Sequence, residues 1–285
     1  MKISLITSTL NRPRQITELL ASLEQQSRAP DQIIIVDQSD DVLTQQAVES
    51  FQDRLPLLYL RDQRKGLSRG RNLGLQYLAG DVVAFPDDDC VYAPDTVAIV
   101  MSEFEALPGL DIFTGMSISP SGAPSQGRWG KVPHTIDKFN IWISQTSYTT
   151  FYRSKIVKDV GGFDESLGVG SGTKWGAGEE TEMMLRALAK GAFGRYDPSL
   201  KVTHPEPLAI FDSAALRRGQ LYNRGFGRVL NLGKYPSWFV AYMAARPLSG
   251  ALAALVRGRM GQAKYRFVAG RERLLGWRDR RESVG

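Results

Sequence analysis

Short apolar runs alternate with amphipathic stretches along the first 120 residues of this chain. Continuous apolar runs predict buried strands, and apolar residues that recur every three or four positions predict helices packed on a sheet. The predicted strands cover residues 3–9, 32–37, 57–60, 81–85 and 111–117. One predicted helix begins at Pro13, and three others cover residues 41–53, 68–78 and 94–107, with Ser68 as a helix cap. Strands separated by helices indicate an α/β domain with a mixed, mostly parallel central sheet.

From residue 119 onward the pattern is less regular. Residues 119–135 and 161–178 are rich in glycine or in turn-forming residues and are predicted to be loops. A helix is predicted over residues 179–190 and a strand over residues 192–202. Long irregular loops inside a compact domain are more often functional than idle, so both loops are candidates for a functional role.

The C-terminal third contains two apolar segments, 237–245 and 251–256, which Arg246 and Pro247 interrupt. A transmembrane helix needs roughly 20 mostly apolar residues, and an arginine near its middle is costly. We therefore expect no membrane span. Two helices at a membrane interface and an ordinary helical appendage packed on the body both remain compatible with the pattern.

Charge is distributed unevenly along the chain. The net charge is +6, but residues 201–285 hold 16 Lys and Arg against 5 Asp and Glu, whereas the first 200 residues hold 20 against 25. The basic balance therefore belongs to a C-terminal extension, residues 206–285, predicted to be helical and amphipathic. Its expected partner is an anionic membrane surface. Nucleic acid is not expected, because no stacking or groove-reading motif accompanies the positive charge.

The bulk composition is that of a globular protein, with 42% hydrophobic and 23% charged residues over 285 positions. The single cysteine, Cys90, excludes an intramolecular disulfide and suits a reducing compartment. The N-terminal apolar segment is too short, and too polar beyond Leu10, for a secretion signal. We expect a cytoplasmic protein that attaches peripherally to the inner face of the cell membrane through its basic extension.

Three consecutive carboxylates, Asp87, Asp88 and Asp89, directly follow the predicted strand 81–85. Adjacent carboxylates repel one another, so a fold that places them at a strand end must balance their charge with a cation. Hard oxygen ligands select Mg²⁺ or Mn²⁺ over softer metals. A solvated acidic turn is the alternative interpretation of the triplet taken alone.

Polar residues also end the other predicted strands. In an open parallel sheet, ligands bind outside the carboxyl ends of the strands. Hydroxyl groups, an isolated carboxylate, a glycine turn with cations before a helix and a metal site would converge there, and this set suits a nucleoside diphosphate. The candidate binding residues are Thr7, Thr9, Asn11, Arg12, Asp37, Gly66, Arg71, Asp87 and Asp88.

Six segments in this order resemble a family 2 glycosyltransferase of the GT-A fold, of the kind that builds bacterial exopolysaccharides and surface glycans. They are TLNR (9–12), IVD (35–37), GLSRGRNLG (66–74), FPDDD (85–89), GGFDE (161–165) and GEETE (178–182). The resemblance covers about residues 1–205. It implies a GT-A (Rossmann-like) transferase domain with a nucleotide-sugar-binding half, 1–118, and an acceptor and catalytic half, 119–205.

The resemblance also implies an activity: inverting transfer of a sugar from a nucleoside-diphosphate sugar to a hydroxyl of a glycan or lipid-linked acceptor, with Mn²⁺ or Mg²⁺. Asp37 would lie against the base, Asp87 near the ribose and Asp89 on the metal. A metal- or diphosphate-contacting histidine is implied at His204, which completes a predicted metal set of Asp87, Asp89 and His204. A turn histidine beside proline is the alternative for His204.

Inversion at the anomeric carbon needs one base for the acceptor hydroxyl. Glu180, at the start of the late predicted helix, is the expected base. The family commonly has Asp in this position and Glu is one methylene longer, so Glu179 stays a candidate. Both could instead be carboxylates that the helix dipole favours at a helix start. Trp175 and Gly178 are candidate acceptor or sugar contacts, with core packing as the alternative for Trp175.

Two other functions remain open at this point. A nucleotidyltransferase acting on sugar phosphates also needs carboxylates and a metal, but it would usually carry a glycine-rich phosphate loop after the first strand, where this chain has Asn11, Arg12, Pro13 and Arg14. A non-enzymatic, membrane-docked binding module would depend on the basic extension. The sugar, the base, the acceptor and the oligomeric state are not determined by the sequence.

Overall fold

The computed structural model describes residues 1–206 and 210–279, which form two compact units. The first unit contains residues 1–163 and 183–206, and the second contains residues 164–182 together with the C-terminal helices. The sequence-based division at residues 205 and 206 differs from these units in one respect. Residues 164–182 group with the C-terminal helices, because part of this segment packs on the first of them.

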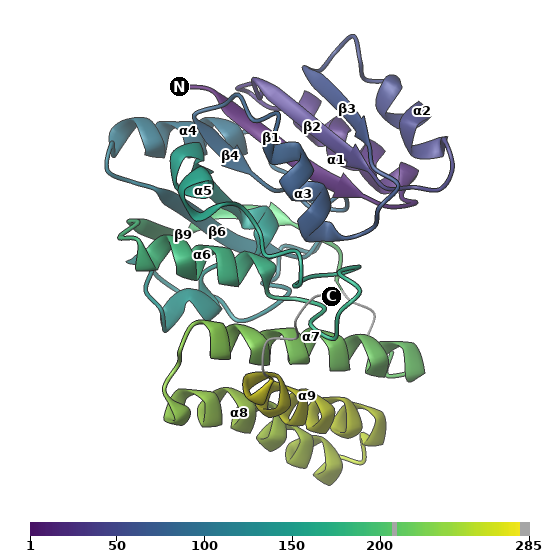
Figure 1. Cartoon of the computed structure of the whole chain (residues 1–285), viewed down its shortest axis with the longest axis vertical. Coiled ribbons are helices and arrows are strands. Elements are labelled where there is room, and N and C mark those ends of the chain that lie inside the picture. The colour runs from purple at the N-terminus through teal and green to yellow at the C-terminus, as the bar shows by residue number, and fades with distance from the viewer. Residues whose placement is uncertain (207–209, 280–285) are drawn as a thin grey trace. The chain divides into compact units, whose positions relative to one another are not determined.

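The first unit is built on a single mixed sheet (Figure 1). Its described strands are β1 (Ile3–Thr9), β2 (Gln32–Asp37), β3 (Leu57–Arg61), β4 (Val82–Ala84), β5 (Val91–Tyr92), β6 (Ile112–Ile118), β7 (His134–Thr135), β8 (Thr150–Arg153) and β9 (Gly194–Thr203). Their order is β3-β2-β1-β4-β8-β6-β9-β5, with β7 paired to β9. β5, β7 and β8 run against the direction of the others. The predicted mixed, mostly parallel sheet is confirmed.

Helices cover both faces of this sheet. They are α1 (Pro13–Glu24), α2 (Leu43–Glu49), α3 (Leu67–Leu75), α4 (Thr96–Ala106), α5 (Ser154–Val160) and α6 (Glu179–Ala189), with short 3₁₀ turns at Asn140–Ile143 and Ser147–Thr149. The predicted cap at Ser68 is wrong, because Gly66 caps α3 and Ser68 is buried in its first turn. The sequence pattern missed β5, β7, β8 and α5, which are too short to show a period.

Strand β1 is buried on both faces. Ile3 and Leu5 contribute to one apolar cluster and Ile6 to the other. Helix α3 approaches this strand closely: a Cβ on Gly74 would lie 2.4 Å from Cγ2 of Ile6, and one on Gly70 would lie 2.2 Å from Oγ of Ser8. Only glycine allows this contact, which holds the start of α3 beside the carboxyl ends of the strands.

The second unit contains the helices α7 (Ser213–Leu232), α8 (Ser237–Val256) and α9 (Met260–Arg278). Asp212 caps α7 by accepting the amide of Ala215 at 2.7 Å. Helices α7 and α9 pack backbone to backbone, since a Cβ on Gly276 would lie 2.1 Å from the carbonyl oxygen of Arg224. The prediction of a helical C-terminal extension is confirmed. The predicted loop 161–178 is also confirmed, because no helix or strand lies between α5 and α6.

Helix α8 continues through Pro247, so the prediction of two separate helices was wrong. Proline has no amide proton and cannot bond the carbonyl four residues earlier, which belongs to Met243. Arg273 of α9 supplies the missing donor: its guanidinium Nη1 lies 2.8 Å from that carbonyl oxygen. Satisfying this group from a neighbouring helix removes much of the reason for a break.

By length and composition, α8 is the one helix in the described part of the chain that could cross a membrane. A third of its most apolar window is buried inside the protein, and one such helix is weak support for a span. Arg246 stands near its middle, where a charge is costly in a bilayer.

Candidate active site

The carboxyl ends of β1, β2 and β4 meet at one edge of the sheet, because these strands are parallel neighbours. Asp87, Asp88 and Asp89 follow β4 at this edge. Thr7 on β1 donates its hydroxyl to the carbonyl of Pro86 at 3.0 Å, which ties the two strand ends together. The convergence predicted from the sequence is therefore present.

Asp88 is held from the β1 side. Its carboxylate accepts the hydroxyl of Thr9 at 2.7 Å and the guanidinium of Arg12 at 2.8 Å. Burial raises the pKa of Asp88 to about 6, although Arg12 and Thr9 act in the opposite direction. Asp88 therefore anchors the loop after β1 to the loop after β4.

Asp89 joins three elements. One carboxylate oxygen lies 2.8 Å from Nη1 of Arg12, and the other lies 2.9 Å from Nε2 of His204, which follows β9. Burial opposes ionisation of Asp89, but His204 and Arg12 outweigh it and lower the pKa of Asp89. Burial likewise works against the charged imidazole, yet Asp89 raises the pKa of His204. His204 also stacks on Tyr148, with ring centres 4.7 Å apart.

Asp87 pairs with a different cation. Arg71 on α3 is buried, and its Nη2 lies 2.7 Å from Oδ1 of Asp87. Ser147 donates its hydroxyl to the same oxygen at 3.2 Å. The guanidinium of Arg71 also lies over the ring of Phe163, 5.3 Å from its centre. The three adjacent carboxylates are thus balanced by protein cations from three separate elements.

Asp37 ends β2 and is fully buried. Its carboxylate accepts the hydroxyl of Tyr59 at 2.7 Å and the amide of Ser39 at 2.9 Å. Burial and the adjacent carboxylate raise the pKa of Tyr59, so this hydroxyl stays a donor. Asn11 joins the same region, because its backbone N–H donates to the hydroxyl of Ser39 at 2.8 Å. The buried carboxylate of Asp37 is therefore a fixed acceptor, suited to a neutral N–H or O–H donor of a ligand.

Gly66 occupies the turn before α3 with a φ of 136°, which side chains rarely adopt. The side-chain Nε2 of Gln38 donates to the backbone carbonyl of Gly66, and the backbone amide of Gly66 donates to the side-chain Oε1 of Gln38, both at 3.1 Å. This reciprocal pair fixes the N-terminus of α3 next to the end of β2, where backbone amides favour an anion.

The metal prediction is only partly matched. In the described part of the chain, no three His, Cys, Asp or Glu side chains form a group that could hold a metal ion. The predicted set of Asp87, Asp89 and His204 is therefore not assembled as a protein cage, because Asp87 pairs with Arg71 while Asp89 pairs with His204. Asp89 with His204 nevertheless fits Mn²⁺ or Mg²⁺, since such ions commonly take one or two carboxylates and complete their shell with substrate phosphates and water.

The remaining predicted site residues belong to the second unit. Glu179 is buried and Glu180 is half-buried in the first turn of α6. Gly178, just before them, has a φ of 96°, so its backbone conformation explains the glycine. The Trp175 side chain is 3% exposed and its ring lies under the guanidinium of Arg228. Core packing, the alternative to a sugar contact, is the interpretation that the structure favours for Trp175.

Three contact residues at this edge were not expected from the sequence: Ser147, Tyr148 and Tyr59. Ser147 and Tyr148 lie in a 3₁₀ turn of an irregular region without periodic signal. Tyr59 was predicted as part of a strand. It pairs with Ile35, two residues before Asp37, so its side chain lies on the same face of the sheet as that of Asp37.

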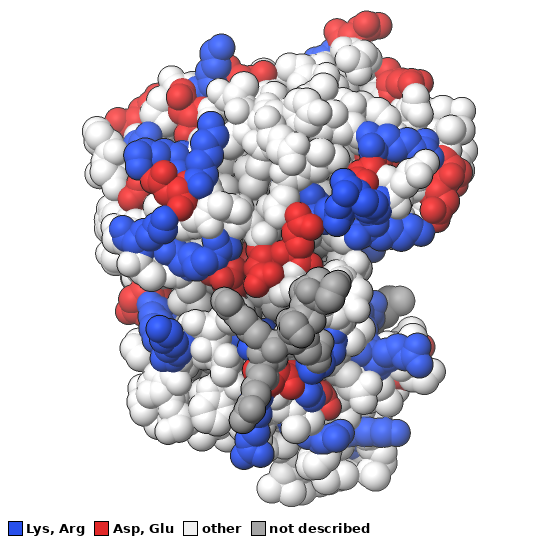
Figure 2. Space-filling model, viewed as in Figure 1, with Lys and Arg blue, Asp and Glu red and all other residues white. Residues whose placement is uncertain are grey.

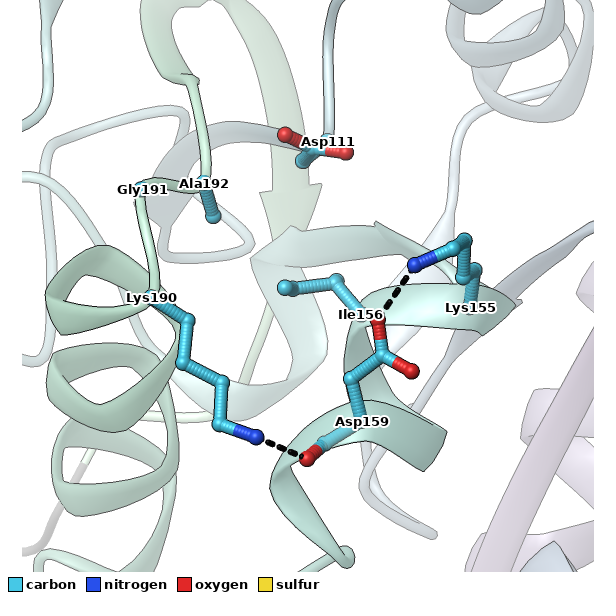
Figure 3. A pocket seen from close by; sticks show the side chains of 7 residues that line it. All are labelled: Asp111, Lys155, Ile156, Asp159, Lys190, Gly191 and Ala192. Carbon is cyan, nitrogen blue, oxygen red and sulfur yellow. Dashed lines mark hydrogen bonds and ion pairs between the residues drawn. The ribbon is translucent and has the colours of Figure 1, made fainter.

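A shallow cavity of about 540 Å³ lies elsewhere on the first unit (Figure 3). It is lined by Asp111, Lys155, Ile156, Asp159, Lys190, Gly191 and Ala192. Asp111 precedes β6, so the cavity lies at the amino ends of the parallel strands, opposite the aspartate triplet. Its lysines are engaged, since both Lys155 and Lys190 bond Asp159 at 2.5 Å. The chemistry of a substrate site is not found there.

Comparison with known proteins identifies the family of this chain. Residues 4–160 match the model of glycosyl transferase family 2. The chain belongs to this family. The resemblance predicted from six motifs is thereby confirmed.

Individual relatives are more distant. A Bacillus subtilis protein described as the uncharacterized glycosyltransferase YfnE is 34% identical over 100 residues, 34% of this chain and 26% of that protein. The poly(ribitol-phosphate) β-N-acetylglucosaminyltransferase TarS of Staphylococcus aureus is 29% identical over 167 residues, 56% of this chain and 29% of TarS. The chain thus matches only about a quarter to two-fifths of the length of the first curated relatives.

Solved structures show the same fold. The mannosyltransferase PcManGT of Pyrobaculum calidifontis, solved with GDP-Man and Mn²⁺, has a TM-score of 0.64 at 17% identity and covers 96% of this chain and 87% of its own. Residues 1–349 of TarS, solved with UDP, have a TM-score of 0.56 at 18% identity, and the match covers 100% of this chain and 94% of that chain. The expected GT-A fold is confirmed.

Proposed function

We propose that this chain transfers a sugar from a nucleoside-diphosphate sugar to a hydroxyl of a glycan or lipid-linked acceptor, with inversion and with a divalent cation. Membership of glycosyl transferase family 2 supports the reaction class. TarS and PcManGT, which were solved with UDP and with GDP-Man, support the type of donor.

One observation carries the proposal: at the carboxyl edge of the sheet, Asp89 lies 2.8 Å from Arg12 and 2.9 Å from His204, and these three residues follow the ends of three different strands. Such an edge is where a nucleotide binds in this class of sheet. Asp37 and its partner Tyr59 form a buried polar group at the end of β2 that suits a nucleobase. The diphosphate would lie toward the cations and the start of α3.

The site residues divide the work. Asp89 and His204 would hold the ion, and the chemistry that a bound Mn²⁺ or Mg²⁺ supplies is neutralisation of charge on the departing diphosphate. Arg71 holds the Asp87 carboxylate in place through their ion pair. Asp88 holds Arg12 in place. PcManGT, which was solved with Mn²⁺, supports the use of such an ion.

Glu180 is proposed as the base that accepts the proton of the acceptor hydroxyl, with Glu179 as the alternative. A single base is sufficient, because inversion proceeds through one in-line displacement. The long irregular segment before both residues supports a role at a substrate, since such loops in compact folds are more often functional.

Donor binding and product identity test the proposal. We expect UDP-GlcNAc, GDP-mannose or dTDP-glucose to raise the melting temperature in the presence of Mn²⁺, because a ligand of the folded state stabilises it. Turnover should release a nucleoside diphosphate and invert the anomeric configuration, as nuclear magnetic resonance of the product would show. Release of pyrophosphate would instead identify a nucleotidyltransferase, and retention of configuration would contradict the single displacement.

We further propose that the protein is cytoplasmic and attaches peripherally to an anionic membrane, close to a lipid-linked acceptor. Leu252, Val256 and Met260, around the α8–α9 turn, are 64%, 82% and 66% exposed. Arg257 and Arg259 lie between them, and basic side chains predominate over α7, α8 and α9 in Figure 2. An apolar tip flanked by arginines matches an interface with acidic lipids.

Flotation with vesicles tests the attachment. Binding to phosphatidylglycerol vesicles should exceed binding to phosphatidylcholine vesicles and should fall in Val256→Asp. Val132→Asp, at an exposed valine of the first unit, should bind as the wild type does. Equal binding to both vesicle types would contradict the electrostatic part. Resistance of the bound protein to alkaline carbonate would indicate a membrane span instead.

A further inference from the structure

The segment that leads into Glu179 and Glu180 lies against helix α7. The amide of Gly176 donates to the carbonyl of Leu221 at 3.1 Å. A Cβ on Gly225 would lie 2.1 Å from the carbonyl oxygen of Ala177. Because no side chain fits at that distance, the glycine in α7 is what allows the segment to lie on the helix.

Two more close contacts join residues 176–178 to α7. A Cβ on Gly176 would lie 2.9 Å from Cβ of Leu221, and one on Gly178 would lie 2.7 Å from Cγ2 of Val229. Leu221, Gly225 and Val229 are four residues apart and therefore share one face of the helix. Residues 176–178 thus follow a single stripe of α7 up to the start of α6.

Asp279, at the C-terminal end of α9, fastens the beginning of this segment. The indole N–H of Trp175 donates to its carboxylate at 2.9 Å. Arg224 of α7 makes a bidentate pair with the same carboxylate, with both distances 2.7 Å. Arg228 donates to the Asp279 carbonyl at 2.9 Å and lies 4.7 Å from the centre of the Trp175 ring.

These contacts among Trp175, Arg224 and Asp279 depend on the negative charge of Asp279. The Asp279 side chain is only 9% exposed. Burial opposes its ionisation, but Arg224 and Trp175 outweigh burial and lower the pKa of Asp279. Removing this charge would leave the half-buried guanidinium of Arg224 with Glu272, at 2.9 Å, as its one acidic partner among the described residues. Loss of one partner of a charge pair that is largely shielded from solvent destabilises the local structure.

We infer that Asp279 is a positioning residue: by holding Trp175 it fixes residues 174–178 on α7 and so orients Glu179 and Glu180. The inference rests on the proposed function, in which one of these two carboxylates is the base. The helices α7 and α9 are then part of the transfer machinery as well as a site of membrane attachment.

Asp279→Asn tests the inference against Asp212→Asn in the 285-residue chain. Asn and Asp cap helices equally well, so the Asp212 variant is a matched substitution in the same unit that leaves the segment alone. In Asp279→Asn we expect chymotrypsin cleavage after Trp175 to rise about fivefold, because the local opening that exposes the bond becomes easier. Nucleoside diphosphate release should fall about tenfold, mainly through kcat, because misplaced groups lose proximity. Donor-induced thermal shifts should stay unchanged.

Gly225→Ala is the second variant, and it leaves the Asp279 contacts in place. Alanine favours the helix more than glycine does, so α7 should persist while its new Cβ displaces Ala177. The same rise in cleavage and the same loss of kcat are expected. Cleavage and kcat both at the wild-type level in either variant would overturn the inference.

The two readouts separate this inference from the proposed function. If the wild type released no nucleoside diphosphate from UDP-GlcNAc or GDP-mannose, the proposed function would be in error. Anchoring of residues 174–178 by Asp279 would then be decided by the cleavage rate alone, which needs no activity.

Discussion

At the candidate site of the first unit, charged side chains meet other charged side chains at the ends of strands, whereas residues 176–178 of the second unit lie against helix α7 through close contacts at glycines. Asp88 and Asp89 are held by Arg12 and His204. Residues 176–178 are held by their close approach to α7. A charged cluster can exchange its partners for a substrate and an ion, and a close-packed segment cannot do so without moving. The comparison therefore suggests a unit that binds and a unit that positions.

The largest effect is expected where the charged cluster meets the ion. Asp89→Ala removes the carboxylate that pairs with both Arg12 and His204. We expect nucleoside diphosphate release to fall about 10³-fold, as for loss of a major electrostatic stabiliser. The Mn²⁺-dependent part of the donor thermal shift should disappear as well.

Asp53→Ala, at an exposed aspartate of the same unit, is the control and should retain both properties. If Asp89→Ala turned over at the wild-type rate both in Mn²⁺ and in excess chelator, the charged cluster would play no part in transfer. The first unit could then no longer be described as the unit that binds the donor and the ion.

The next effect concerns the carboxylates at the start of α6. Glu180→Gln should lower release about 10²-fold, because an amide cannot accept the hydroxyl proton. Glu179→Gln should lower release by less than about tenfold. Kinetics of both variants at saturating donor would measure the difference.

Glu182→Gln serves as the control, since Glu182 is a third acidic residue in the first turn. If all three variants lose only a few tenths of a kcal/mol of stability, as expected for the helix dipole, and none loses activity, the carboxylates are structural. The reverse ranking of Glu179 and Glu180 would exchange their proposed roles.

The sequence was informative where the chemistry is local. The motifs TLNR and FPDDD follow strands whose apolar runs are unambiguous, so Arg12 and the aspartates could be placed at one edge before the structure was known. Their partners were less accessible. Ser147 lies in an aperiodic turn, and its contact with Asp87 joins residues 60 positions apart.

The second unit was harder to predict for a physical reason. Helix α8 continues through Pro247 because Arg273, 26 residues later, satisfies the carbonyl of Met243. The buried Trp175 donates its indole N–H to the carboxylate of Asp279, 104 residues later. Neither partner carries a local signal. The tendency of proline to end a helix is weaker where another donor satisfies the freed carbonyl.

A smaller effect, on stability, is expected at Gly74, where α3 packs closely on β1 in the first unit. In Gly74→Ala the new Cβ would meet Ile6 at 2.4 Å, so α3 must move off β1. We expect the free energy of unfolding to fall by about 1–3 kcal/mol, as for overpacking elsewhere. Gly109→Ala has nothing within 4 Å of its new Cβ and is the matched control. Equal stability of both variants by urea denaturation would show that the first unit does not depend on close backbone packing.

The smallest effect is expected at Pro247, and it has the opposite sign. Pro247→Ala restores an amide donor to the carbonyl of Met243, which Arg273 now bonds. Proline inside a helix costs about 3 kcal/mol, but Arg273 already offsets part of this cost, so we expect a gain of only about 1 kcal/mol in the free energy of unfolding. Pro236→Ala is the control. Pro236 is the N-cap of α8, where the helix needs no hydrogen bond from the backbone N–H, so this substitution should change the stability little. A gain near the full cost of an interior proline would show that Arg273 contributes nothing, and a loss of stability would show that α8 needs the proline for its packing on α9.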